Sequence, residues 1–253
     1  MQLFPGITAE RTAAYIEPIK TLVLSDLHLG YEEELRRKGV YIPTGEFARI
    51  EKLLDHLVTK FKPKIIVLNG DIKHSFGSIN SHEWKHTKLI LERLQTKSKV
   101  ILVQGNHDPV LAPVAKAAGL TVEPYHIEEQ YFFVHGDAIP ETKLLKGITT
   151  IIIGHEHPAV NLHNGIRGEI YKCFLTMKYK TCDLLVLPST FGLTQGADVL
   201  ATEPRNPLLK NLADANVFVV EEEQVLAFGS VKELRAMLPK PEADSRTTRT
   251  RRR

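Results

Sequence analysis

The stretch KIIVLNGD, residues 64–71, decides the fold class of this chain. It begins as a run of aliphatic, largely β-branched side chains and ends abruptly at Gly70 and Asp71. A short run that is apolar on both faces is typical of a strand buried inside a sheet. A carboxylate directly after such a strand lies at the sheet edge where α/β folds collect their ligands. The stretch therefore predicts an α/β fold with a polar site at its strand ends.

Four other apolar runs end at polar residues in the same way. They are residues 21–25 (TLVLS), 100–104 (VILVQ), 131–134 (YFFV) and 149–153 (TTIII). Helical patterns separate the early runs, at residues 45–61, 81–96 and 109–119. Later in the chain, strands are expected at 184–187, 216–220 and 224–228, followed by a short helix at 231–238. Alternating strands and helices followed by more strands predict two sheets packed face to face, with helices outside.

The second of these helices, residues 81–96, has an apolar set at helical spacing. We expect that set to face the sheet; its members are Trp84, Leu89, Leu91 and Leu94. The first helix, residues 45–61, is followed by Pro63, which ends it.

The composition is that of an ordinary globular domain. Of 253 residues, 43% are hydrophobic and 25% are charged, and no apolar stretch approaches the roughly 20 residues that a membrane span requires. The first residues lack the pattern of a signal peptide, so we expect a cytoplasmic protein without membrane contact. Cys173 and Cys182 are expected as reduced structural thiols, and a bridge between them stays open as the alternative.

Positive charge is concentrated at the carboxyl end. Residues 239–253 hold six basic and two acidic residues, so residues 1–238 carry about −1 of the total charge of +3. We therefore expect a single domain over residues 1–238 and a basic, disordered tail over 239–253. The tail either adds salt-dependent affinity for nucleic acid or only aids solubility. Arg36, Arg37 and Lys38 leave a similar choice between contacts to a nucleic-acid backbone and pairing with Glu32, Glu33 and Glu34.

Each apolar run leads into a motif rich in metal-binding side chains. The motifs are D-x-H at 26–28, G-D-I-K-H at 70–74, G-N-H-D at 105–108, H-G-D at 135–137 and G-H-E-H at 154–157. Their candidate ligands are Asp26, His28, Asp71, Asn106, His135, His155 and His157. Oxygen and nitrogen ligands without sulfur suit Mn, Fe, Zn or Ni. This set can hold two divalent ions side by side, an arrangement suited to hydrolysing phosphate esters.

In this order the five motifs resemble those of the calcineurin-like metallophosphoesterase superfamily, whose fold is a four-layer α/β/β/α sandwich. The matching fold would occupy most of the chain. The resemblance implies one metal ion held by Asp26, His28, Asp71 and His157 and a second held by Asp71, Asn106, His135 and His155. We expect Mn at both positions, and the same ligands would accept Fe, Ni, Co or Zn.

The resemblance also gives His107 and Asp108 roles beside the metals. In the family, the imidazole at the place of His107 is not a ligand but faces the phosphate and helps to protonate the leaving oxygen. Asp108 is expected to orient His107, as carboxylates commonly orient imidazoles. The implied mechanism is in-line attack by a metal-bridging hydroxide, with the two ions roughly 3.5–4 Å apart.

His74, three residues after Asp71, narrows the resemblance. Many family members carry Asp or Asn at this place, whereas a His is similar to the SbcD-like nucleases and to the PdeM-like ligase-associated endonucleases. In those enzymes it contacts the phosphate during diester cleavage. The sequence around the motifs is similar to the second group, at Gly30-Tyr31-Glu32, at residues 35–39 (LRRKG) and at 155–160 (HEHPAV). The resemblance is therefore to a small, uncapped, archaeal-type PdeM-like enzyme.

These observations predict a dinuclear-metal-dependent phosphodiesterase that acts on nucleic acid, with single strands or ends of DNA or RNA as its substrate. A phosphoesterase for a small nucleotide or cyclic nucleotide is the alternative, because an open site accepts either. The complete ligand set disfavours a third class, a binding or regulatory subunit without activity. The near-neutral body counts against a duplex-binding surface. A homodimer is compatible with the sequence, but no feature specifies one.

Overall fold

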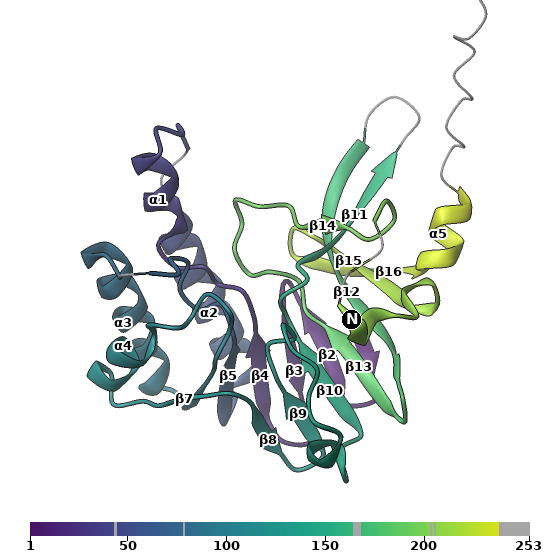
Figure 1. Ribbon diagram of the computed structural model, residues 1–253, viewed down its shortest axis with the longest axis horizontal. Helices are drawn as coiled ribbons and strands as arrows, with labels where there is room; N and C mark the ends of the chain where they lie inside the picture. The colour runs from purple at the N-terminus through teal and green to yellow at the C-terminus, as the bar shows by residue number, and fades with distance from the viewer. Residues whose placement is uncertain (43–44, 78, 164–167, 203, 205, 238–253) are drawn as a thin grey trace, which may run out of the picture.

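The computed structural model describes residues 1–42, 45–77, 79–163, 168–202, 204 and 206–237. Within these residues the chain forms two sheets with helices on their outer faces (Figure 1). The predicted boundary between domain and tail falls at the edge of the described residues, and the predicted tail lies outside them. None of the described helices combines the length and the apolar character needed to cross a bilayer.

The first sheet follows the order of the chain. In the described residues its strands are β1 (Gln2–Phe4), β2 (Ile7–Glu10), β3 (Ala13–Ile16), β4 (Thr21–Leu24), β5 (Ile65–Asn69), β6 (Lys99–Val103) and β7 (Val122–Glu123). The first four strands pair antiparallel, and β4 to β7 pair parallel. Because parallel strands need crossovers, helices connect them. These helices are α1 (Tyr31–Arg37), α2 (Glu46–Phe61), α3 (Ser81–Gln95) and α4 (Ala112–Ala117).

The second sheet is mixed and packs against the first. Its strands in the described residues are β8 (His126–Glu128), β9 (Tyr131–Phe133), β10 (Thr150–Ile153), β11 (Pro158–His163), β12 (Gly168–Tyr179), β13 (Cys182–Val186), β14 (Ala197–Asp198), β15 (Asn216–Glu221) and β16 (Gln224–Ser230). At its centre β9, β10 and β13 run parallel. A 3₁₀ turn, η1 (Thr142–Leu145), lies between β9 and β10.

Three apolar clusters separate the layers. One lies between the sheets and includes Val67 and Ile101 from the first and Phe133 and Ile152 from the second. Another joins the first sheet to α2, α3 and α4, which lie together on its outer side (Figure 1). Burial of these aliphatic faces on both sides of each sheet explains why the strand sequences are continuously apolar.

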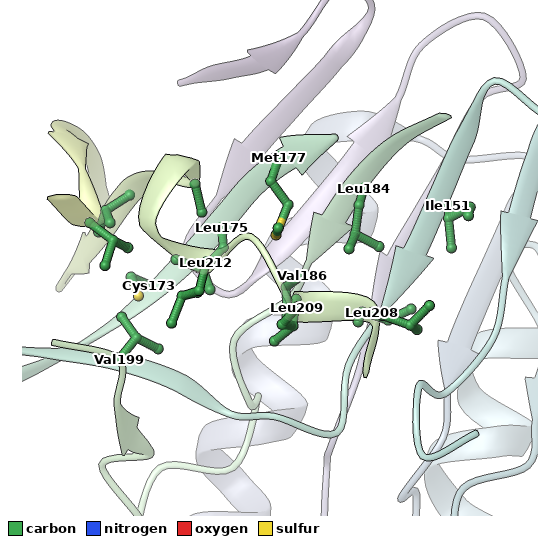
Figure 2. Packing of buried hydrophobic residues seen from close by; sticks show 14 of the residues in the cluster. Ile151, Cys173, Leu175, Met177, Leu184, Val186, Val199, Leu208, Leu209 and Leu212 are labelled. Carbon is green, nitrogen blue, oxygen red and sulfur yellow. The ribbon is translucent and has the colours of Figure 1, made fainter. Parts of the chain in front are cut away.

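The third cluster covers the outer face of the second sheet. Leu184 and Val186 of β13 pack there against Leu208, Leu209 and neighbouring residues of η2 (Pro207–Leu209), η3 (Leu212–Asp214) and α5 (Val231–Met237) (Figure 2). This side of the predicted α/β/β/α sandwich is therefore helical, but it is built from short segments. Cys173 and Cys182 are both free and buried in this cluster.

Two sequence expectations about helices need correction. Leu89 of α3 is 43% exposed, because the face turned to the sheet carries Ile90, Leu91 and Leu94 together with the buried polar residue Glu83. The third helix begins at Ala112 rather than at residue 109, because residues 108–111 form a turn in which Leu111 N–H donates to the carbonyl of Asp108.

Candidate metal centre

All seven predicted ligands meet where the central strands of the two sheets end. Asp26 and His28 follow β4, Asp71 follows β5, and Asn106 follows β6, all in the first sheet. His135 follows β9, and His155 and His157 follow β10, in the second sheet. The predicted convergence of five strand ends on one crevice is present, and the functional roles of these residues remain predictions.

The first group of ligands contains Asp26, His28, Asp71 and His157, whose donor atoms lie within 4.8 Å of one another. The Nε2 atom of His157 lies 3.0 Å from Oδ1 of Asp26 and 3.3 Å from Nε2 of His28. The Nε2 atom of His28 lies 3.8 Å from Oδ2 of Asp71. This is the set that the resemblance implies for one metal ion.

The second group contains Asp71, His135 and His155, again within 4.8 Å of one another. The Oδ1 atom of Asn106 joins them, at 3.1 Å from Nε2 of His135 and 2.9 Å from Nδ1 of His155. Nε2 of His135 lies 3.3 Å from Oδ2 of Asp71. Because Asp71 belongs to both groups, its carboxylate is placed to bridge two ions.

The backbone at these strand ends adopts a conformation that non-glycine residues rarely occupy. Five of the seven ligands have left-handed backbone, with φ of 55° at Asp26, 45° at His28, 50° at Asp71, 68° at His155 and 45° at His157. Strain of this kind costs about 1–3 kcal/mol per residue and tends to occur at functional sites.

Glycines allow the ligand loops to approach one another closely. A Cβ atom at Gly105 would collide with the backbone nitrogen and carboxylate of Asp71. A Cβ atom at Gly154 would collide with Ser25 and with the carboxylate of Asp26. The glycines of the G-N-H-D and G-H-E-H motifs are therefore required by packing against ligands rather than by turn geometry.

Burial and charge set the protonation of the ligands in the metal-free protein. Burial opposes ionisation of Asp26, but the neighbouring imidazoles, His157 foremost, hold its pKa well below the usual range. Burial lowers the pKa of His28 to about 3. Burial also opposes a charge on His135, yet its bond to Asp71 and the charge of Asp26 raise its pKa to about 9.

The donor set suits two divalent cations. Nε2 of His28 and Nε2 of His157 face each other at 3.3 Å, and so do Nδ1 of His155 and Nε2 of His135. Two imidazole nitrogens at this separation can share only one proton between them, whereas a cation can accept the lone pairs of both rings once they are neutral. Nitrogen and oxygen donors without sulfur match divalent first-row transition metals, so the residues present fit the implied ions.

His107 lies beside the shared ligand but is oriented differently from the sequence expectation. Its Nε2 atom is 4.0 Å from Oδ2 of Asp71, and its backbone N–H donates to Oδ1 of Asp71 at 2.8 Å. Its Nδ1 atom lies 2.6 Å from the carbonyl oxygen of His74. The structure therefore places the His74 carbonyl at this ring nitrogen, where the sequence predicts Asp108.

Asp108 instead ties together two ligand loops. Its carboxylate accepts hydrogen bonds from the backbone N–H groups of Ile72 and Lys73 at 3.2 Å each and of Gly105 at 3.1 Å. Burial raises the pKa of Asp108 to about 6 despite these three donors. The carboxylate thus joins the backbone that follows Asp71 to the backbone that precedes Asn106, and the His107 ring is held by the His74 carbonyl.

His74 completes a trio of imidazoles with His28 and His107, which have ring nitrogens within 4.8 Å of one another. Its Nδ1 atom is 3.3 Å from Nδ1 of His28, and its Nε2 atom is 3.4 Å from the carboxylate of Glu34. Burial lowers the pKa of His74 to about 4. The ring therefore lies beside the first group of ligands, where the resemblance places a phosphate contact.

Sequence reasoning missed two buried charged residues that support these loops. Glu83 in the first turn of α3 is fully buried, and its Oε1 accepts the backbone N–H groups of His74 at 3.0 Å and Ser75 at 2.9 Å. Lys73 is also fully buried, and its ammonium donates to the carbonyls of Ser75 and His107. A charged residue within a helix face that is otherwise apolar was the available signal for Glu83.

A groove of about 660 Å³ runs past this centre. Its lining includes His28, His74, His107 and His157 and also residues 194–197. The basic residues in and directly after α1 each form an ion pair, Arg36 with Glu32, Arg37 with Glu33 and Lys38 with Glu34. Their positive charges are therefore balanced by neighbouring carboxylates. The pairing alternative from the sequence is therefore the one that the structure contains.

Two packed mixed sheets with these ligands at their strand ends define a class of metal-dependent phosphoesterases. Residues 19–176 match the family model described as calcineurin-like phosphoesterase, and the chain belongs to that family. This supports the assignment as a hydrolase that uses divalent metals. No curated protein sequence matches the chain.

One solved structure agrees with the fold over most of both chains. The nuclease MPE of Pseudomonas putida is 18% identical, with a TM-score of 0.60 over 86% of this chain and 92% of that chain. The phosphoesterase YfcE of E. coli is 16% identical and has a TM-score of 0.40, covering 83% of this chain and 98% of that chain. The Vacuolar Protein Sorting 29 protein of Cryptosporidium parvum is 14% identical and also has a TM-score of 0.40, covering 83% of this chain and 95% of that chain. At these identities the likeness concerns the fold alone.

Proposed function

We propose that this protein is a dinuclear-metal-dependent phosphodiesterase that cleaves nucleic acid, with single strands or strand ends as its substrate. The observation that carries the proposal is the pair of imidazoles, His74 and His107, placed beside the ligand groups without belonging to the implied ligand sets. Mn is the expected metal. Two bound ions would activate the attacking water and neutralise charge on the phosphate.

The residues of the chain divide the remaining tasks. His107 presents Nε2 toward the shared ligand Asp71 while its Nδ1–H is held by the His74 carbonyl. In the doubly protonated imidazolium form, the proton on Nε2 would pass to the leaving oxygen, and the ring would return to its neutral form. The His74 ring is placed to contact a phosphate oxygen. Glu83 holds the backbone of His74, and Lys73 holds the backbone of His107.

The shape of the site supports a diester. A phosphodiester continues on both sides of phosphorus, so its site needs room beyond the phosphate itself. The groove lined by His28 and His107 is also lined by residues 194–197 and, at about 660 Å³, gives that room. The paired charges on α1 favour a single strand or an end over a long duplex, because a duplex-binding face usually carries a stripe of free basic residues.

One observation favours the alternative substrate, a small nucleotide. A cavity of about 290 Å³ lies between α1, α2 and α3 and shares His28 and Phe191 with the groove. Its volume is close to that of small-ligand sites, which begin at about 300 Å³. A nucleotide could place its phosphate at the ligands and its base in this cavity.

The deciding experiment compares a diester with a monoester, bis-p-nitrophenyl phosphate with p-nitrophenyl phosphate, with added Mn and with a chelator. The wild type, His74→Ala and Asp71→Ala are measured in parallel, and labelled single-stranded DNA follows. We expect metal-dependent cleavage of the diester, no activity in Asp71→Ala, and a selective loss of diester cleavage in His74→Ala. Cleavage of the monoester alone would overturn the nuclease proposal and direct the search to small phosphoesters.

A further inference from the structure

A row of aromatic and imidazole rings in contact lies beside the ligands. Tyr31 stacks on His74 with ring centroids 3.7 Å apart, and Phe76 lies against His107 at the same separation. His74 and His107 themselves are 5.1 Å apart, and Phe191 lies 5.2 Å from Tyr31. The two imidazoles proposed to act on the phosphate are therefore held between two aromatic side chains.

Phe76 is the outermost ring of this row. It lies in the loop between β5 and α3, and it is 57% exposed. Its ring contact among the described residues is His107, whereas Tyr31 has both His74 and Phe191 beside it. Phe76 thus contacts His107 with its ring tilted by 38°, and the exposed remainder of the ring is available to a ligand.

The position of this ring relates it directly to a bound phosphate. His107 Nε2 is 4.0 Å from Oδ2 of Asp71, the carboxylate common to both ligand groups. A phosphate held at those ligands would be separated from Phe76 by a single imidazole. In a nucleic acid, the nearest flat apolar group to a phosphate is the base of an adjoining nucleoside.

We propose that Phe76 stacks against a nucleobase next to the scissile phosphate. The inference rests on the proposed function and specifies its substrate as a strand whose base at this place is unpaired and turned out. Stacking of bases on aromatic side chains tolerates every base, because each base has a π-face. A duplex hides these faces, so Phe76 gives preference for single strands without contacts specific to sequence.

The test uses ester substrates that differ only in the nucleoside. Thymidine 5′-(p-nitrophenyl phosphate) and thymidine 3′-(p-nitrophenyl phosphate) are compared with methyl p-nitrophenyl phosphate, which has the same leaving group and no base. The quantity measured is the ratio of kcat/KM for each nucleoside ester to kcat/KM for the methyl ester, in the Mn-loaded protein. We expect Phe76→Ala to lower this ratio by on the order of tenfold for at least one nucleoside ester.

Two further variants separate stacking from support of His107. Phe76→Trp keeps a larger stacking surface and should retain or raise the ratio, whereas Phe76→Leu keeps bulk against His107 and should lower the ratio as Phe76→Ala does. Phe228 on β16 is 37% exposed and provides the matched control, so Phe228→Ala should leave the ratio at the wild-type value.

Three outcomes would overturn the inference. Equal losses for the nucleoside and methyl esters would show that Phe76 only supports His107. A wild-type ratio near one would show that no base is recognised, even where both esters are cleaved and the phosphodiesterase proposal stands. Conversion of a dimer to a monomer by Phe76→Ala, seen by sedimentation, would show that the ring covers a second copy of the chain. Absence of all diester cleavage would instead remove the proposed function itself, and this inference with it.

Discussion

The Nδ1 atom of His107 lies 2.6 Å from the backbone carbonyl oxygen of His74. A carbonyl only accepts, so this contact requires the proton of His107 on Nδ1 and leaves Nε2 to exchange a proton with substrate. The carbonyl belongs to the loop whose N–H groups are held by Glu83, so the orientation of the ring depends on a buried residue of α3. Two imidazoles on different loops are in this way fixed as one unit.

Loss of the His107 side chain should lower turnover while leaving metal binding intact. In His107→Ala the backbone N–H that donates to Oδ1 of Asp71 is still present, so the shared ligand keeps its position. We expect kcat for the diester to fall by about 10²- to 10⁴-fold, the usual contribution of a general acid. Metal content by elemental analysis should equal that of the wild type, and wild-type turnover in the metal-loaded variant would refute the role.

Replacement of Asp108 should affect stability first. Asp108→Asn keeps the shape of the side chain but turns an amide N–H₂ toward at least one of the three backbone donors that the carboxylate now accepts. We expect unfolding in urea to show a loss of about 1–3 kcal/mol. Asp137→Asn, at an exposed carboxylate of the H-G-D motif, is the matched control and should show no change. Unchanged stability in Asp108→Asn would contradict the tie between the loops.

Removal of Glu83 should loosen the loop that carries His74. Glu83→Ala removes a buried carboxylate that accepts the N–H group of Ser75 and shares the N–H group of His74 with the Leu29 carbonyl. We expect a loss of stability on the order of 2 kcal/mol and a lower kcat for the diester. Glu83→Gln, which keeps an acceptor oxygen, should recover part of both losses.

Glu92 on the exposed face of the same helix supplies the control for this comparison. Glu92→Ala should change stability by less than about 0.5 kcal/mol, as is usual for surface positions. Equal effects of Glu83→Ala and Glu92→Ala would show that the buried carboxylate does not support the loop.

The sequence predicted the parts of this fold that have strong local signals. Runs such as residues 64–69 became buried parallel strands because aliphatic residues on both faces need cover from two layers. The convergence of the predicted ligands could be anticipated because they lie shortly after these strands. The antiparallel strands of residues 2–16 could not, since they are short and their burial depends on sheet partners distant in sequence.

The orientation of side chains within the site was the other feature that the sequence could not predict. Neighbouring positions in the chain suggested that Asp108 serves His107, yet the left-handed backbone at Asp71 brings Ile72 and Lys73 N–H to that carboxylate. Glu83 and Phe76 could not be placed because their partners, His74 and His107, come from other loops. Contacts between loops depend on backbone geometry that local sequence patterns do not specify.

Metal binding should expel a proton and depend on pH. Burial lowers the pKa of His135, but Asp71 and Asp26 together raise it to about 9. The ring is therefore charged at pH 7 in the metal-free protein. Coordination needs the neutral imidazole, so metal affinity should rise as pH increases toward 9. In the metal-free protein the charged His135 ring stabilises the folded state, because its folded pKa lies above the ordinary value of 6.5. This stabilisation is complete below pH 6.5 and is lost as pH rises through 9.

Calorimetry can count this proton. Titration of the metal-free protein with Mn at pH 7 in two buffers of different ionisation enthalpy should report release of about one proton from His135. His28 has its pKa lowered to about 3 by burial, so its ring is already neutral at pH 7 and should release none. Identical heats in both buffers would show that His135 is neutral before metal binds.

Ligand variants should reveal that Asp71 is common to two ions. Its carboxylate lies 3.8 Å from Nε2 of His28 in the first group and 3.3 Å from Nε2 of His135 in the second, whereas His155 contacts the second group alone. An amide cannot supply the charge that a bridging position needs, so Asp71→Asn should retain close to no tightly bound metal. His155→Ala should lose one ion and keep the other, and His56→Ala, at a histidine paired with Glu10 on the surface, should keep both. Elemental analysis after dialysis measures these contents, and two ions in Asp71→Asn, or none in His155→Ala, would contradict the shared-ligand geometry.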